Sequence, residues 1–341
     1  IKYVDPSIAT GGDGAAPSTA LKALPSLSSN LENDTMYLIR RTAETSFVSL
    51  PGGRNNNITK IAFIGMPKPE DPLYNYVPAL ARTEWGSDQA EYAQLHVGSY
   101  DDSENSGGTV YSYIATNGII QFEMSRINFQ KETVSVSGYN QYSCFYFDGG
   151  SNPLISFTNN RFCGLDEPLD TTFANQPTSG KHTGYLYAQV VADVFTCSNN
   201  IICYQGKSDY DSGYSMYAFY VYRVNGTYDM CNNTIYACSS GDYKGNDGPY
   251  GQASVFYFES NQTYNTYRNI NNHVYYILTN GKNWPGIFNQ YSNGGCRDAV
   301  FKNFTVEAGR VISTPTEIGI VSPIFRGPYG CLLYTSDAAD E

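Results

Sequence analysis

The sequence predicts an all-β solenoid in which each coil contains three short strands. Side-by-side asparagines recur in the contexts FTNNRFCG, TCSNNIICYQG, MCNNTIYACSSG and NINNHVYYILTNG, with a looser copy in FKNFTVEAG, and they lie 31 to 40 residues apart. The composition also favours strands over helices, because the chain has 31 tyrosines, 32 glycines and only 16% charged residues.

Each repeat has the same internal order. An aromatic strand comes first, a turn such as GGSN or VNGT follows, a second strand leads into the asparagine pair, and a third strand ends at a glycine. Asparagine tolerates the left-handed backbone of a tight corner, and stacked asparagine amides can hydrogen-bond to one another. We therefore expect one column of asparagines, formed by Asn160, Asn200, Asn233 and Asn272 and continued by Asn303.

These repeats resemble the right-handed parallel β-helix of the pectin-lyase-like superfamily. The opening KYVDPSIATGGDGAAPSTALKAL resembles the N-terminal edge of many secreted bacterial members, and NDTMYLIRR resembles the strand that follows their cap. Pro25 should shorten the cap helix. The resemblance implies a right-handed β-helix and an extracellular or cell-surface protein. It implies no activity, because the R-x-P-x-x-R spacing of pectate lyases and the G-H-G of polygalacturonases are absent.

We expect a single domain over residues 1–330. Its N-terminal cap would cover 1–35, and its clear coils would run over 119–325. KIAFIG reads as an early coil strand. The segment 66–108 is interpreted as an insertion packed on one face of the solenoid, with a helix-like stretch around Asp88–Leu95.

The net charge of the chain limits the kinds of partner that it can bind. The last residues, CLLYTSDAADE (331–341), read as the translation of a sequencing adapter, and we expect them to be an artefact. The net charge is −11 with these residues and −8 without them, which argues against nucleic-acid binding. No apolar run of about 18 residues is present, so no membrane span is expected.

Acidic and aromatic residues are concentrated in the loops after the closing glycines, which stacking should bring together as a wall. Aromatic rings stack on sugar faces, while carboxylates bind hydroxyls or act as acid and base. The alternative is that these loops are simply polar and solvated. The expected substrate-binding residues are Tyr210, Asp242, Tyr243, Asp247 and Trp284, and the expected catalytic residues are Asp148, Asp209, Asp211 and Glu259.

Asp148 and Glu259 end two of the aromatic first strands, 12 and 13 residues before the closing asparagine of each repeat. Their side chains should reach the same face if the strand register holds. An inverting hydrolase would need two carboxylates about 6.5–9.5 Å apart.

No resident metal is expected, because the chain has only three histidines and no C-x-x-C pair. Calcium is a possible ligand, since the aspartates of two successive loops, at 209, 211, 242 and 247, could supply oxygen atoms. Cys163 and Cys203 should lie one above the other in the core, either as buried thiols or as a disulfide between coils.

Two functions fit the sequence. The first is an extracellular carbohydrate-active enzyme, either a polysaccharide lyase or an inverting glycoside hydrolase. The second is a non-catalytic adhesin or phage-fibre-like binding protein. A lyase of anionic polymers would need several Lys or Arg in its groove, whereas the loops offer mainly acids. The sequence therefore disfavours a lyase and supports a hydrolase and a binding protein equally. In either case the expected partner is a polysaccharide or other glycan.

Overall fold

The structure, a computed structural model, describes residues 1–25, 31–50, 53–54, 57–97, 111–116, 118–131, 142–148, 153–162, 182–207, 216–240, 253–259, 266–270, 272–278, 288–291, 298–302 and 305–310. These residues are predominantly β-strand, and every strand pair among them is parallel. The predicted β class is therefore confirmed.

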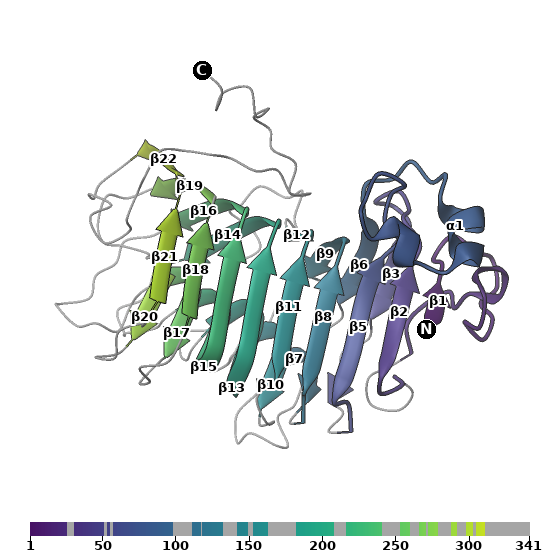
Figure 1. The fold of residues 1–341 in the computed structure, drawn as a ribbon, viewed down its shortest axis with the longest axis horizontal. Coiled ribbons are helices and arrows are strands. Elements are labelled where there is room, and N and C mark those ends of the chain that lie inside the picture. The colour runs from purple at the N-terminus through teal and green to yellow at the C-terminus, as the bar shows by residue number, and fades with distance from the viewer. Residues whose placement is uncertain are drawn as a thin grey trace.

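The strands lie in three stacks, arranged as in a solenoid (Figure 1). The first stack holds β4 (Gly53–Arg54), β7 (Tyr111–Thr116), β10 (Tyr142–Asp148), the first halves of β13 (His182–Ser198) and β15 (Met216–Cys231), β17 (Ala253–Glu259) and β20 (Phe288–Tyr291). The second holds β1 (Lys2–Val4), β2 (Thr35–Ile39), β5 (Lys60–Gly65), β8 (Gln121–Ser125), β11 (Leu154–Thr158), the second halves of β13 and β15, β18 (Thr266–Ile270) and β21 (Asp298–Lys302).

The third stack is a separate sheet. It holds β3 (Val48–Leu50), β6 (Ala93–Val97), β9 (Ile127–Lys131), β12 (Arg161–Phe162), β14 (Ile201–Lys207), β16 (Thr234–Ser240), β19 (His273–Leu278) and β22 (Thr305–Arg310). Each circuit of the chain thus adds one strand to each stack, which confirms the predicted order of strands around the asparagine pairs.

A column of buried asparagines joins successive circuits, as predicted. Asn160, Asn200, Asn233 and Asn272 are at most 1% exposed. The backbone N–H of Asn160 donates to Oδ1 of Asn200 at 2.9 Å, that of Asn200 donates to Asn233 at 3.0 Å, and that of Asn233 donates to Asn272 at 2.8 Å. Each Nδ2 also donates to a backbone carbonyl of the preceding circuit. Asn303 lies outside the described residues.

The two asparagines of each pair have different roles. The first residue adopts the left-handed conformation, with φ of 57° at Asn159, 58° at Asn199 and 58° at Asn232. Asparagine tolerates this region better than most residues, so the first position turns the corner and the second forms the ladder. In the preceding circuit Arg126 takes the corner position with φ 59°. The ladder ends there, because the next residue, Ile127, supplies only a backbone N–H to Asn160.

The core between the stacks is aromatic. Phe122, Phe195 and Tyr228 lie in one register row of the second stack and are almost fully buried. Their rings contact neighbouring phenylalanines, with centroids 5.3 Å apart for Phe122–Phe157 and 5.9 Å apart for Phe195–Tyr228. Such tilted pairs add about 0.5–1.5 kcal/mol each beyond their buried area.

The corner at VNGT differs from the predicted turn. β15 runs through this corner as one strand, and Asn225 and Gly226 together face Asp193 of β13. This is a β-bulge, which bends the strand from the first stack into the second without ending the ladder. A Cβ on Gly226 would lie 2.2 Å from the carbonyl oxygen of Asp193, so only glycine fits there.

The segment 66–108 contains less insertion than expected. Its helix, α1, spans Ala79–Trp85, so the expected helix around Asp88–Leu95 is wrong. Residues Ala93–Val97 instead form β6, which pairs with β3 and β9 of the third stack. The N-terminal cap has no α-helix in its described part, and only a 3₁₀ turn, Pro17–Thr19, is present. A second 3₁₀ turn, Tyr74–Tyr76, precedes α1.

The insertion covers the outer face of β1, β2 and β5 near the N-terminus (Figure 1). Trp85 of α1 packs edge-on against Tyr3, with centroids 5.7 Å apart, and both belong to a small core that includes Leu38 and Ile64. Three arginines, Arg40, Arg41 and Arg126, bind residues of the insertion through hydrogen bonds or ion pairs.

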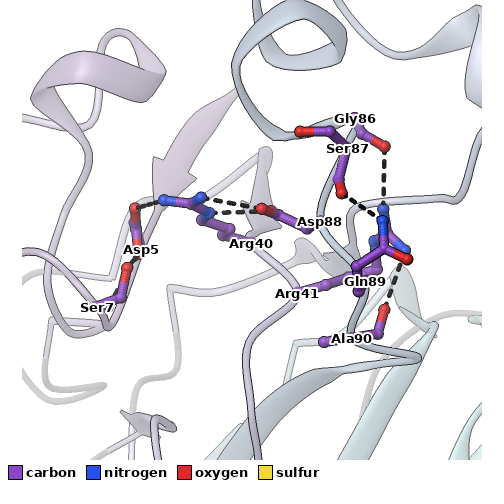
Figure 2. A network of polar contacts seen from close by, with 9 residues as sticks. All are labelled: Asp5, Ser7, Arg40, Arg41, Gly86, Ser87, Asp88, Gln89 and Ala90. Carbon is purple, nitrogen blue, oxygen red and sulfur yellow. Dashed lines mark hydrogen bonds and ion pairs between the residues drawn. The ribbon is translucent and has the colours of Figure 1, made fainter.

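Arg40 forms a two-pronged ion pair with Asp88, at 2.9 Å for each contact, and also binds Asp5 at 2.9 Å (Figure 2). The hydrogen bonds that Arg40 donates to Asp88 raise the pKa of Arg40, although burial opposes the rise, so the guanidinium stays charged. Arg41 donates to the carbonyls of Ala90 and Gly86, next to the end of α1. Arg126 binds Asp71 through Nε and Nη2, and both side chains are under 10% exposed.

Replacing Asn200 with Leu should destabilise the protein by about 2–4 kcal/mol, because the N–H of Asn160 and the carbonyl of Phe157 would be buried without partners. Urea unfolding would measure the loss. Asn225→Leu is the control, since Asn225 is exposed, and should change stability by less than about 0.5 kcal/mol. Equal losses would contradict the ladder.

Replacing Arg126 with Met should cost about 3–5 kcal/mol, because it leaves the buried carboxylate of Asp71 without its partner. The double variant Arg126→Met/Asp71→Leu should recover most of the loss. Lys2→Met breaks the exposed pair with Glu32 and should cost about 1 kcal/mol or less. A single Arg126 variant as stable as Lys2→Met would show that the ion pair does not hold the insertion.

Candidate functional site

The strands of the first stack place alternate residues on opposite faces. In β10, Phe145 and Phe147 are buried in the main core. Tyr146 lies between them and is half-buried. It packs with Tyr220 and Tyr222 of β15 in a cluster separate from the main core. We call the side that carries Tyr146 and Tyr220 the first-stack face.

One tyrosine per strand occupies the same register row on four neighbouring strands. Tyr146 pairs with Tyr187, Tyr187 with Tyr220, and Tyr220 with Tyr257. This tyrosine row therefore repeats at the strand spacing of about 4.8 Å. Tyr220 is fully buried, whereas Tyr146 and Tyr222 are partly exposed. The ring surface open to a ligand at the described side chains is thus that of Tyr146 and Tyr222.

Asp148 and Glu259 each lie one residue beyond a register row that neighbours the tyrosine row. This neighbouring row is continuous and consists of Phe147, Ala188, Val221 and Phe258. Asp148 directly follows Phe147 in β10, and Glu259 directly follows Phe258 in β17. Asp148 itself pairs with Gln189, and Glu259 pairs with Tyr291.

The same registers set the distance between these two acids. Three strand spacings separate β10 from β17, which amounts to about 14 Å between the two backbone positions. Inversion requires about 6.5–9.5 Å between the two carboxyl groups, so these acids would form a direct pair only with their side chains inclined toward each other along the stack. A hydrolytic pair at this face would otherwise draw on another residue.

The remaining predicted site residues lie outside the described part of the chain: Asp209, Tyr210, Asp211, Asp242, Tyr243, Asp247 and Trp284. The predicted loop wall and the predicted calcium ligands stay predictions for the same reason. Cys163 also lies outside. Cys203 is in β14, and the two cysteines described with their side chains, Cys197 and Cys231, are free thiols.

The structure adds a carboxylate that the sequence reading did not select. Glu123 of β8 is partly buried, beside Ser156 in the second stack, and burial raises its pKa while the nearby Arg126 opposes the rise. Perturbed carboxylates are common at functional sites, although structural ones occur as well. The sequence contains a signal for this residue. The alternation in QFEMS (121–125) places Glu123 on the other face of the strand from the buried Phe122 and Met124.

Comparison of the chain with protein families, with curated proteins and with solved structures finds no match. The functional argument therefore depends on the residues of this chain alone. Within the described residues, no three His, Cys, Asp or Glu side chains gather closely enough to hold a metal ion. No helix in that part of the chain has the length and hydropathy needed to cross a membrane.

Replacing Glu123 with Gln should raise the melting temperature at neutral pH. The raised folded-state pKa means that ionised Glu123 disfavours the fold above that pKa, and that this cost disappears as the pH falls below the unfolded-state value. The gain should therefore shrink between neutral pH and about pH 4. Glu70→Gln, on the exposed surface of the insertion, is the control. A gain that does not depend on pH would contradict the burial argument.

Proposed function

We propose that the protein is an extracellular carbohydrate-binding or carbohydrate-processing protein with a right-handed parallel β-helix fold of the pectin-lyase-like type. The observation that carries this proposal is the tyrosine row, with Asp148 and Glu259 one residue beyond the neighbouring row of the same sheet. Aromatic rings offer flat apolar surface to sugar rings, and carboxylates accept hydrogen bonds from hydroxyls.

The finer fold assignment has its own support. Three stacks of parallel strands and a buried asparagine column are what a β-helix of three-strand coils requires. The extracellular location is supported by the resemblance of the opening residues to secreted bacterial proteins. Fold alone does not select an activity, so the site has to do so.

Two activities remain in competition at this face. A hydrolase needs an acid and a base at the scissile bond, and the backbones of Asp148 and Glu259, about 14 Å apart along the stack, leave room for a closer partner. The residues Asp209, Asp211, Asp242 and Asp247 are the candidates for the missing partner. A non-catalytic adhesin needs only the rings and the hydrogen-bonding groups. The wide spacing of Asp148 and Glu259 along the stack favours binding, because binding does not need two neighbouring carboxylates.

A glycan array, followed by assays for new reducing ends and for unsaturated products, tests this proposal. A hydrolase releases reducing ends alone, a lyase also forms unsaturated products, and a binder forms neither. If the protein is a hydrolase, Asp148→Asn or Glu259→Gln should lower kcat about 10²- to 10⁴-fold. If it is a binder, each of these variants should still bind.

Tyr146→Ala should weaken binding about tenfold in either case, as should Trp284→Ala if the loop wall forms as predicted. Tyr76→Ala is the matched control, because Tyr76 is 85% exposed and lies on the insertion. Melting curves would show whether each variant is folded. The proposal fails if no glycan binds, or if folded Tyr146→Ala and Tyr76→Ala variants bind equally well.

A further inference from the structure

We infer that the ligand of the first-stack face is an uncharged polysaccharide, lying along the stack from Tyr146 of β10 to Tyr222 of β15. This inference rests on the proposed function and specifies the class of glycan. It follows from the charges at the described strand positions and from the direction of the two rows.

The strands of this face carry almost no positive charge. β7, β10, β17, β20 and the first halves of β13 and β15, up to Tyr222, contain neither Lys nor Arg. Two described cations lie nearest to these rows. Arg54 of β4 is in the tyrosine row, two strands before Tyr146. Arg223 of β15 pairs with Val191 and lies further along the strand than either row. A polyanion needs cations to offset its repulsion and its lost hydration.

The charged groups that are present have the opposite sign. Asp148 and Glu259 flank the middle of the face, and the chain as a whole carries a net charge of −11. A uronic-acid polymer laid across these strands would bring carboxylates toward carboxylates. A neutral chain would avoid this repulsion, and its hydroxyl groups could donate hydrogen bonds to the carboxylates of Asp148 and Glu259.

The geometry also sets an orientation and a length. Both rows run across the strands, so a chain that follows them lies along the stack. One strand spacing, about 4.8 Å, is close to the length of one pyranose unit in an extended chain. The partly exposed rings of Tyr146 and Tyr222 lie on β10 and β15, two strand spacings apart, so each added sugar unit should gain contacts until about three units are bound.

Calorimetric titration of the whole protein tests this. The probes are neutral oligosaccharides of glucan, xylan, mannan and galactan with two to six units, and oligogalacturonates of the same lengths. The best neutral series should bind about tenfold or more tightly than the oligogalacturonates at low salt, and this gap should narrow as salt screens the repulsion. The affinity of the neutral series should rise with chain length and level off near three units.

Charge variants separate repulsion from simple preference. Asp148→Asn/Glu259→Gln should strengthen oligogalacturonate binding several-fold. Glu70→Gln/Glu84→Gln removes the same net charge from exposed positions on the insertion and should leave that binding unchanged. Oligogalacturonates that bind as tightly as neutral chains, equal effects of the two double variants, or neutral binding without length dependence would each overturn the inference while leaving the proposed function intact. If no glycan binds, the proposed function fails with it.

Discussion

The buried asparagine ladder is the constraint on which the rest of the structure depends. Each ladder side chain accepts a hydrogen bond from the backbone of the circuit before it and donates one to a carbonyl of that circuit. A shift of one residue would leave these groups unpaired in the core and would turn the apolar residues outward. The ladder therefore fixes the register of β11, β13, β15 and β18, and the aromatic core rows follow from it.

The sequence predicts the features that are local and repeated. The ladder positions and the strands at RF and HVYYIL could be found because each repeat places similar residue types next to an asparagine pair. The insertion contains no repeat. Its helix lies at Ala79–Trp85, and Ala93–Val97 became a strand because β3 and β9 offer it partners distant in sequence. Local patterns carry no information about such pairing.

The candidate site could be predicted in part. The prediction that the side chains of Asp148 and Glu259 share a face stays a prediction, because the structure describes only their backbones. Their separation depends on how many strands lie between them, and the sequence reading did not apply that count. The tyrosine row was also readable, because CFYFD, YLYAQ, AFYVY and VFYFE each carry a tyrosine between two apolar residues.

Stacking in parallel register restricts what such a face can carry. Identical residues lie about 4.8 Å apart in a row, which suits tyrosines and asparagines because they can pack and hydrogen-bond to one another. Carboxylates at that spacing would repel. In this protein Gln189 lies beside Asp148, and the next acid, Glu259, is three spacings away. That distance exceeds the screening length of about 10 Å at 0.1 M salt. The first-stack face can therefore hold two acids at low electrostatic cost.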